Sequence, residues 1–289
     1  MKLIKQSFEF INQTDFSLVG IKKHIEKCAR VSYKSEDKIT DTSYEKFVNM
    51  LESRGHDRPL EFGTVYLSRT SQKEDNMEWL DKYAYNPWSK FSFGNGSTRI
   101  NGELRNTIYV TTNYRVIKEH HWEDDLQYLC EPTEYHHKRY TVHRILDRGV
   151  MDEFRTHVGL SHLAESTRYC NYSKDKFDNE VTFIKPCWEI KTANEVITPE
   201  GTHMSSNSLE FLTALNEAED HYLSLLAKGW TPQQARSVLP LGIKSELISC
   251  GFEDAWENFM RRRDASDAHP MAQEIAKPMH KEFLKLTKV

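Results

Sequence analysis

The 289-residue sequence contains no apolar run long enough to cross a membrane and no excess of positive charge. Because a bilayer-spanning helix needs about 20 predominantly apolar residues, we expect no transmembrane helix. The opening MKLIKQSFEF also lacks the continuous apolar core of a secretory signal. The formal net charge of -4 disfavours a general nucleic-acid binder, because duplex affinity depends mainly on neutralisation of phosphates by Lys and Arg. It leaves open a single nucleotide as ligand, which needs only a few local arginines.

Cysteine is scarce, and its spacing forms no pattern. The five cysteines are scattered, odd in number and without a CxxC pair, which indicates reduced thiols in a cytoplasmic protein. The histidines of EHHW and EYHHKRY, with Cys130 between them, match no zinc-ligand spacing, so we expect no metal site. The sequence also has no GxSxG, no Walker loop and no GxGxxG after a strand. Any flavin or nicotinamide cofactor therefore binds without a Rossmann fingerprint.

Hydrophobic periodicity predicts a chain in which helices and strands interleave. Apolar residues at helical spacing predict helices over 17–32, 42–55, 208–229, 231–240, 252–263 and 270–286, with a short helix near Val150. β-rich or alternating stretches predict strands over 63–70, 106–117, 139–149, 180–186 and 243–250. Residues 71–106 are polar and rich in Asn, Gly and Ser, which indicates a long loop or insertion. Because the elements follow no regular βαβ order, we expect one α+β domain over residues 1–289, with a mixed or antiparallel sheet and packed helices.

Residues 152–175, DEFRTHVGLSHLAESTRYCNYSKD, read as a helix that runs into a polar, irregular segment. Within it, Ser166 and Thr167 precede Arg168. Hydroxyls, backbone N–H groups and a guanidinium fork together make a good grip for a phosphate or carboxylate. The plain alternative is a solvated turn with a capping serine. Arg236, in the short helix QQARSVLP, reads alone as an ordinary surface arginine.

Arg263 falls on the apolar face of the predicted helix 252–263. That face is marked by i, i+4, i+7, i+8 and i+11 spacing of Phe252, Trp256, Phe259, Met260 and Arg263. An unpaired buried charge is costly, so this arginine needs a partner, either a carboxylate or a ligand, unless its side chain reaches past the last turn. His56, in RGHDRPLEFG, lies between a helix end and a strand, where it could contact a ligand or cap the helix.

Six blocks in the correct order resemble the flavin-dependent thymidylate synthases. The family signature has Arg-His-Arg, seven residues and then Ser, usually followed by Arg and Tyr. Here THVGLSHLAESTRY has the right length from Thr156 to Ser166, and the segment agrees with family members that read ESTRYCNYS. The other blocks are ARVSYKS (29–35), RGHDRPLEFGTVYL (54–67), VTTNYRVI (110–117), PQQARSVLPLGIKSEL (232–247) and WENFMRRRDASDAHP (256–270).

The resemblance implies the fold of that family and a homotetramer whose sites lie between subunits. It implies conversion of dUMP to dTMP, with the methylene group from methylenetetrahydrofolate, the hydride from reduced FAD and reducing equivalents from NADPH. No cysteine attacks the uracil, so Cys187 is not a nucleophile. Carried over by position, the dUMP residues are Glu153, Glu165, Ser166, Thr167, Arg168, Arg236 and Arg263, with Arg263 as the catalytic residue at the uracil. The FAD residues are Ser32, His56, Arg58, Thr156, His157, Val158 and Asn258.

The signature departs from the family pattern at two pairs of positions. Thr156 and Val158 stand where the family has arginines, and Leu163 and Ala164 replace the usual Asn or Ala followed by Glu or Gln. Arg155 is one position early and would point about 100° away on a continuing helix. Because Thr and Val cannot replace a forked, permanently charged donor, we predict weak FAD retention. The alternatives are a related pyrimidine-nucleotide C5 hydroxymethylase and a nucleotide-binding homologue without catalysis.

Overall fold

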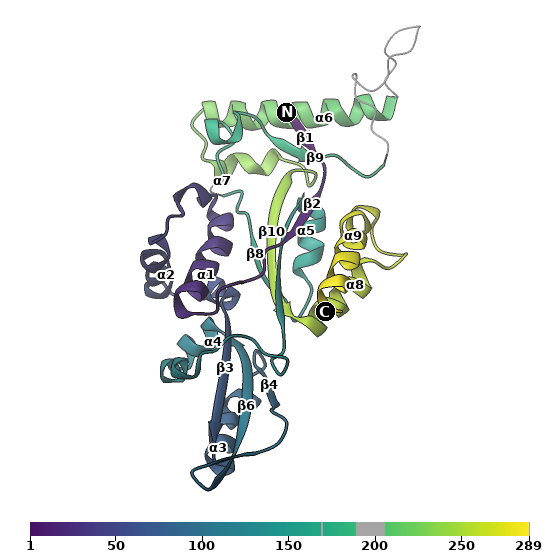
Figure 1. Ribbon diagram of the computed structural model, residues 1–289. Coiled ribbons are helices and arrows are strands. Elements are labelled where there is room, and N and C mark those ends of the chain that lie inside the picture. Colours follow the sequence, from purple (N-terminus) through teal and green to yellow (C-terminus); the bar gives the residue numbers. More distant parts are fainter. Residues whose placement is uncertain (169, 189–205, 289) are drawn as a thin grey trace.

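The computed structural model describes residues 1–168, 170–188 and 206–288 (Figure 1). Its strands are β1 (Lys2–Ile4), β2 (Ser7–Phe10), β3 (Thr64–Ser71), β4 (Lys90–Phe93), β5 (Thr98–Ile100), β6 (Glu103–Asn113), β7 (Arg139–Asp147), β8 (Ser161–Ala164), β9 (Thr182–Ile184) and β10 (Lys244–Phe252). Its α-helices are α1 (Leu18–Tyr33), α2 (Ser43–Ser53), α3 (Lys73–Ala84), α4 (Tyr114–Glu119), α5 (Arg148–Arg155), α6 (Ser206–Ala227), α7 (Pro232–Ala235), α8 (Glu253–Arg263) and α9 (Pro270–Thr287). The α+β fold expected from the sequence is confirmed. No helix in the described part of the chain is long and apolar enough to cross a membrane.

The central sheet has the order β2-β7-β10-β8 and is antiparallel throughout. Its long middle pair is β7 and β10, in which Arg144 lies opposite Leu247. Helices α5 and α8 pack against β10 and α9 packs against β2, whereas α1 contacts β8 and β10 from the other side (Figure 1). The edge strand β8 therefore lies beside α1 and leads directly into the polar segment 165–168.

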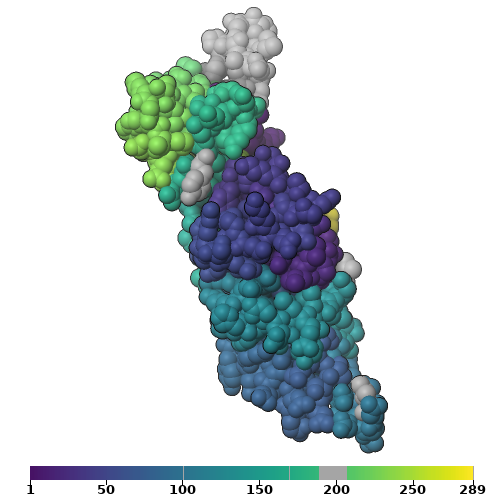
Figure 2. Space-filling model, turned by 90° about the vertical axis from the view of Figure 1, so that its left-hand side faces the viewer, coloured from purple at the N-terminus to yellow at the C-terminus, as the bar shows by residue number. Residues whose placement is uncertain are grey.

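Two smaller sheets flank the central one. β1 and β9 form a parallel pair near α6, and β3, β6 and β4 form an antiparallel sheet to which β5 is added. The sheet of β3, β6 and β4 extends away from the central sheet, so the molecule is elongated (Figures 1 and 2). Figure 2 shows the face on which the purple α1–α2 pair lies next to the teal and green upper segments.

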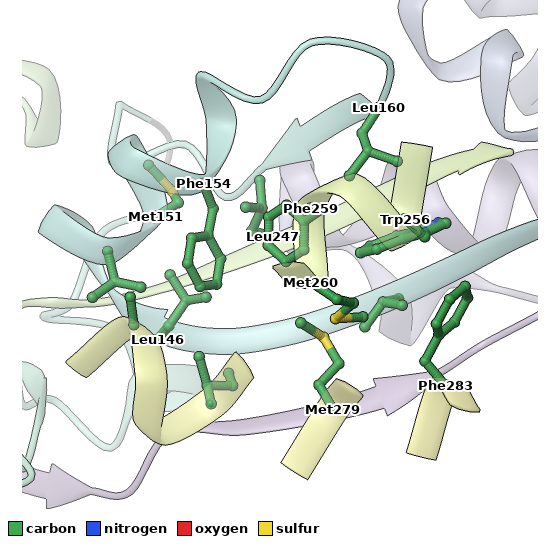
Figure 3. Close-up of a cluster of buried hydrophobic side chains, with 14 of the residues drawn as sticks. Leu146, Met151, Phe154, Leu160, Leu247, Trp256, Phe259, Met260, Met279 and Phe283 are labelled. Carbon is green, nitrogen blue, oxygen red and sulfur yellow. The ribbon is translucent and has the colours of Figure 1, made fainter. Parts of the chain in front are cut away.

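The largest hydrophobic core lies between the central sheet and helices α5, α8 and α9 (Figure 3). Trp256, Phe259 and Met260 are fully buried there, as the helical spacing predicted. The indole Nε1 of Trp256 donates to the backbone oxygen of Tyr140 at 3.0 Å, so its polar atom is satisfied. Because this face is filled, α8 is held firmly and its last residue, Arg263, lies against α5.

The range 71–106, which we expected to be a long loop, contains α3, β4 and β5. The loop prediction is wrong because α3 buries Trp79, Leu80 and Tyr83 despite its polar composition. Trp79 Nε1 donates to an oxygen of Asp125 at 2.9 Å, and the Tyr83 hydroxyl donates to the other oxygen. A carboxylate distant in sequence therefore stabilises the helix. Whether this range is an insertion stays a prediction.

Two further segments differ from their predicted structure. The strand expected over 106–117 ends at Asn113, whose side chain accepts a hydrogen bond from the Val116 N–H at 3.1 Å and caps α4. The segment after α5, expected to be irregular, contains the short strand β8, which pairs with β10 between Ser161 and Ala164. The helix expected over 231–240 is α-helical only over Pro232–Ala235 and continues as a 3₁₀ turn over Arg236–Val238. The other helices and strands predicted from the sequence are present within a few residues of their expected bounds.

We expect His24 to make the fold sensitive to acid. This α1 side chain is buried, with Nε2 3.4 Å from Thr141 Oγ1, and burial, followed by Lys27 and Arg139, lowers its pKa to about 3. The unfolded chain, with a histidine pKa near 6.5, therefore binds more protons between about pH 6.5 and 3, and stability falls as pH falls through that window.

The His24→Gln variant should show a shallower acid slope, by up to about 1.4 kcal/mol per pH unit in the free energy of unfolding. Urea titrations at a series of pH values measure it. His221→Gln, at an exposed position on α6, is the matched control. An unchanged slope in His24→Gln contradicts the prediction.

Candidate active site

A cleft of about 410 Å³ lies where segments far apart in the sequence meet. The end of α1, both ends of α5, the edge strand β8 and the 3₁₀ turns at 58–62 and 236–238 all contribute to its walls. The lining residues are Ser32, Tyr33, His56, Arg58, Arg148, Arg155, His162, Leu163, Ala164, Glu165, Ser166, Thr167, Arg168 and Arg236. Residues predicted for the flavin and residues predicted for the nucleotide thus line one cleft.

The polar segment 166–168 is held by the short helix α7. Pro232 begins this helix, and a capping box between Thr231 and Gln234 fixes its start, with the Thr231 N–H 2.9 Å from Gln234 Oε1. The helix thereby positions Arg236, whose Nη1 donates to Thr167 Oγ1 at 3.1 Å. Arg168 Nε donates to Gln233 Oε1 at 2.9 Å. Hydroxyl and guanidinium groups from two segments therefore meet at one place, as an anion requires.

Glu165 belongs to a buried charge network beneath the cleft. Its Oε2 accepts from Lys244 Nζ at 2.9 Å, and both Lys244 and Lys34 contact Glu246. His143 Nε2 lies 2.8 Å from the Glu246 carboxylate. Burial lowers the pKa of Lys34, but Glu165 and Glu246 outweigh it and raise that pKa to about 12. Glu165 is therefore neutralised by lysines and leaves the cleft above it positive.

The part of the cleft that is lined by the predicted flavin residues continues into a neighbouring cleft of about 440 Å³. Ser32, His56 and Arg58 line both. The His56 ring Nδ1 is 3.2 Å from the Tyr33 hydroxyl. The Ser32 Oγ is buried and has no hydrogen-bond partner among the described residues. An orphaned hydroxyl at the junction of two clefts is suited to a polar ligand atom.

A second group of predicted residues lies between α5 and α8, outside that cleft. Arg263 forms an ion pair with the Glu153 carboxylate, and its Nη2 donates to the Glu153 backbone oxygen at 2.8 Å. The same Nη2 is 3.4 Å from Thr156 Oγ1. His157 is buried against Phe259, and burial, with a smaller effect of Arg263, lowers its pKa. The carboxylate partner considered for Arg263 is thus present, although its Nε has no hydrogen-bond partner in the described residues.

Two predicted flavin residues, Val158 and Asn258, are absent from the lining of the cleft. Val158 is 89% exposed, in the turn that leads from α5 to β8. Gly159 follows with a φ of +96°, a left-handed conformation that glycine adopts without strain. Asn258, on α8, accepts hydrogen bonds from Arg261 at 2.8 Å and from Arg262 at 3.3 Å. Neither residue lines the cleft within one chain.

The sequence reasoning missed Arg148 as a cleft residue and turned Arg155 away from the site. The expectation for Arg155 assumed a helix that continues through the signature, but α5 ends at Arg155 itself. Thr156 caps the end, with its N–H 3.4 Å from the Glu153 backbone oxygen. Both arginines consequently line the cleft. Arg148 was expected at the end of the strand over 139–149, so the i, i+7 spacing of the two arginines on one helix follows from the observed bounds of α5.

A hydrogen-bonded relay sets the state of His162, another cleft residue that the sequence did not indicate. Arg144 is fully buried and can only donate, so Ser249 Oγ accepts from it. The Ser249 hydroxyl in turn donates a hydrogen bond to His162 Nδ1 at 2.7 Å, and His162 Nε2–H donates to the His157 backbone oxygen at 3.3 Å. Burial, followed by Arg144, lowers the pKa of His162 to about 3. His162 is therefore neutral in a defined tautomer.

The chain is similar to a known protein family and to a solved structure. The family model described as thymidylate synthase complementing protein matches residues 82–287, which is more than half of the chain. Among solved structures, the chain is similar to the UMP/dUMP methylase PolB from Streptomyces cacaoi bound with 5-Br UMP, with a TM-score of 0.43 and 16% identity. That alignment covers 99% of this chain and 92% of the other. Curated protein sequences give no match. Among the described residues, no group of three or more His, Cys, Asp or Glu could hold a metal ion.

Proposed function

Because the chain belongs to the thymidylate synthase complementing protein family, we propose that it is a flavin-dependent thymidylate synthase that methylates dUMP at the uracil C5. The observation that carries the proposal is that Thr167, Arg236 and Ser32 line the same cleft. dUMP and FAD both combine a flat ring system with phosphate groups. The cleft offers guanidinium, hydroxyl and imidazole groups suited to both.

The 5′-phosphate of dUMP would bind at the 166–168 segment. Thr167 and Arg236 already share a hydrogen bond, so the arginine is oriented before the ligand arrives. A preorganised guanidinium loses less freedom on binding than a free side chain does. Arg168, held by Gln233, gives a second fork from the same wall.

The donor set on the other side of the cleft fits a flavin. Ser32 offers a hydroxyl without a partner among the described residues, and Arg58 and His56 stand beside it along the path into the neighbouring cleft. When bound, FAD reduced by NADPH supplies the hydride, and methylenetetrahydrofolate supplies the methylene group. The chain's own residues bind, orient and shield these ligands.

Arg263 would contact the uracil and favour its N3-ionised form. Since Arg263 and Glu153 lie outside the cleft of their own chain, we propose a cytoplasmic homotetramer in which α8 of one subunit completes the cleft of another. The Arg263 Nε, without a partner in the described residues, supports a further contact for this side chain. Developing charge on the uracil would be stabilised by such a preorganised cation.

The Cys187→Ser variant should keep its activity, because the proposed chemistry uses no thiolate. Cys187 is an exposed free cysteine, and partial desolvation of its thiol, followed by the negative charge of Glu274, raises the pKa of that thiol. A nucleophilic cysteine needs the opposite environment. Steady-state turnover and intact-protein mass of a dUMP incubation check it. A covalent nucleotide adduct at Cys187 would overturn the flavin-dependent mechanism.

A titration tests the proposed function cheaply. We expect the protein to bind added FAD, measured by flavin fluorescence quenching, and to bind dUMP in calorimetry. Thr156 and Val158, in place of the signature arginines, favour a second candidate, a pyrimidine-nucleotide C5 hydroxymethylase. A protein that binds dUMP and turns over folate but binds no flavin supports that candidate. One that binds dUMP without any turnover is a non-catalytic homologue.

A further inference from the structure

The cleft carries more positive charge than one nucleotide phosphate requires. Five of its lining residues are arginines, whereas the whole chain has a net charge of -4. Its lining carboxylate, Glu165, is paired with Lys244. A nucleoside monophosphate brings about two negative charges, which Arg168 and Arg236 suffice to match. The other lining arginines, among them Arg148 and Arg155, remain to be explained.

Arg148 and Arg155 line the cleft from the two ends of α5. They share one carboxylate: Asp152 Oδ2 lies 3.3 Å from Arg148 Nε, and Asp152 Oδ1 lies 3.2 Å from Arg155 Nη1. Two guanidinium groups with one carboxylate keep a net positive charge and further N–H donors. The carboxylate also holds both side chains along the same face of the helix. Arg155 at a helix C-terminus would stabilise α5 wherever it pointed, but that does not explain why both arginines line the cleft.

Thr156 and Val158, at the two signature positions, do not supply a positive charge to the cleft of their own chain. Thr156 Oγ1 donates to the Glu153 backbone oxygen at 2.7 Å, and Val158 is 89% exposed. Because α5 ends at Arg155, the backbone turns away immediately after it. The guanidinium that reaches the cleft is thus supplied one position earlier than in the family pattern.

We propose that Arg155 and Arg148, bridged by Asp152, form a second anion-binding subsite that takes a diphosphate group. Resting on the proposed function, we assign this subsite to the diphosphate of FAD. The subsite replaces the charged hydrogen bonds that arginines at positions 156 and 158 would have donated to the diphosphate. Flavin retention by this chain then depends on Arg155, and this proposal replaces the weak retention that the sequence predicts for the unsubstituted protein.

The test compares ligands with and without a diphosphate. FAD, riboflavin and inorganic pyrophosphate are titrated into the unsubstituted protein, Arg155→Ala, Arg148→Ala and Arg155→Lys, by flavin fluorescence quenching or calorimetry. Arg155→Ala should weaken FAD about ten- to a hundredfold and leave riboflavin and dUMP within about threefold. Arg155→Lys, which keeps the charge but loses the fork, should lie between. Arg105→Ala, at an exposed ion pair far from the cleft, is the matched control.

The outcomes separate the subsite from the function. FAD binding that survives both alanine variants, or riboflavin binding that falls as much as FAD, overturns the subsite. If the unsubstituted protein binds no FAD but its pyrophosphate affinity still depends on Arg155, the subsite stands and the flavin-dependent function falls. Thermal melts of each variant exclude unfolding as the cause of a loss.

Discussion

The Arg263→Ala variant is expected to lose about a hundred- to a thousandfold in dUMP turnover while it remains folded. Arg263 is the last residue of α8, and the buried apolar face of this helix fixes its position in the fold. The place of the guanidinium is therefore set by the packing of the core. It would stabilise negative charge that develops on the uracil, an interaction worth several kcal/mol in a shielded site. The loss should therefore appear in kcat more than in KM.

The fold should tolerate this change because the partner left behind is accessible to water. Glu153 has a side-chain exposure of 33%, so its carboxylate can be hydrated when the ion pair is lost. Arg261→Ala, at an exposed position on the same helix, is the matched control and should keep its turnover. Near-normal kcat in Arg263→Ala, with an unchanged circular dichroism spectrum, removes this residue from the proposed catalytic role.

The Arg236→Ala variant is expected to bind dUMP about a hundredfold more weakly. It loses a charge-assisted contact to the phosphate, and it also releases Thr167, whose hydroxyl Arg236 holds at 3.1 Å. Isothermal calorimetry with dUMP and with deoxyuridine separates the phosphate from the rest of the ligand. Deoxyuridine, which has no phosphate, should bind both proteins equally.

Ser237→Ala provides the control for this variant. Its hydroxyl donates to the Gln234 backbone oxygen at 2.9 Å within the same turn, but it does not line the cleft. It should leave dUMP affinity unchanged. An Arg236→Ala protein that loses deoxyuridine and dUMP affinity alike would mean that Arg236 supports the shape of the cleft and not the phosphate.

The sequence predicted correctly those helices whose apolar spacing or capping residues lie within a few adjacent turns. The apolar stripe of α8 and the Thr231–Gln234 capping box are properties of adjacent turns, and both are present as expected. Helix α3 was missed because its stability comes from Asp125, which accepts hydrogen bonds from Trp79 and Tyr83 across more than forty residues of sequence. Strand β8 was missed because four residues carry little pattern until β10 pairs with them.

The candidate site shows the same division. Ser166, Thr167 and Arg168 were indicated by their own chemistry, and their meeting with Arg236 required the family resemblance. The place of Arg155 could not be predicted, because it depends on the residue at which α5 ends. A difference of one helical position decides whether a guanidinium enters the cleft, and boundaries are the least certain part of any sequence-based prediction.

The most direct test of the central claim is the mass of the nucleotide after reaction. The protein is incubated with dUMP, methylenetetrahydrofolate, FAD and NADPH, and the nucleotide is separated and analysed by mass spectrometry, with omission of FAD as the control. The flavin-dependent synthase predicts a product heavier than dUMP by one methylene group that co-elutes with dTMP and requires FAD. An unchanged nucleotide, or one that has gained a hydroxymethyl group in reactions with and without FAD, would contradict it.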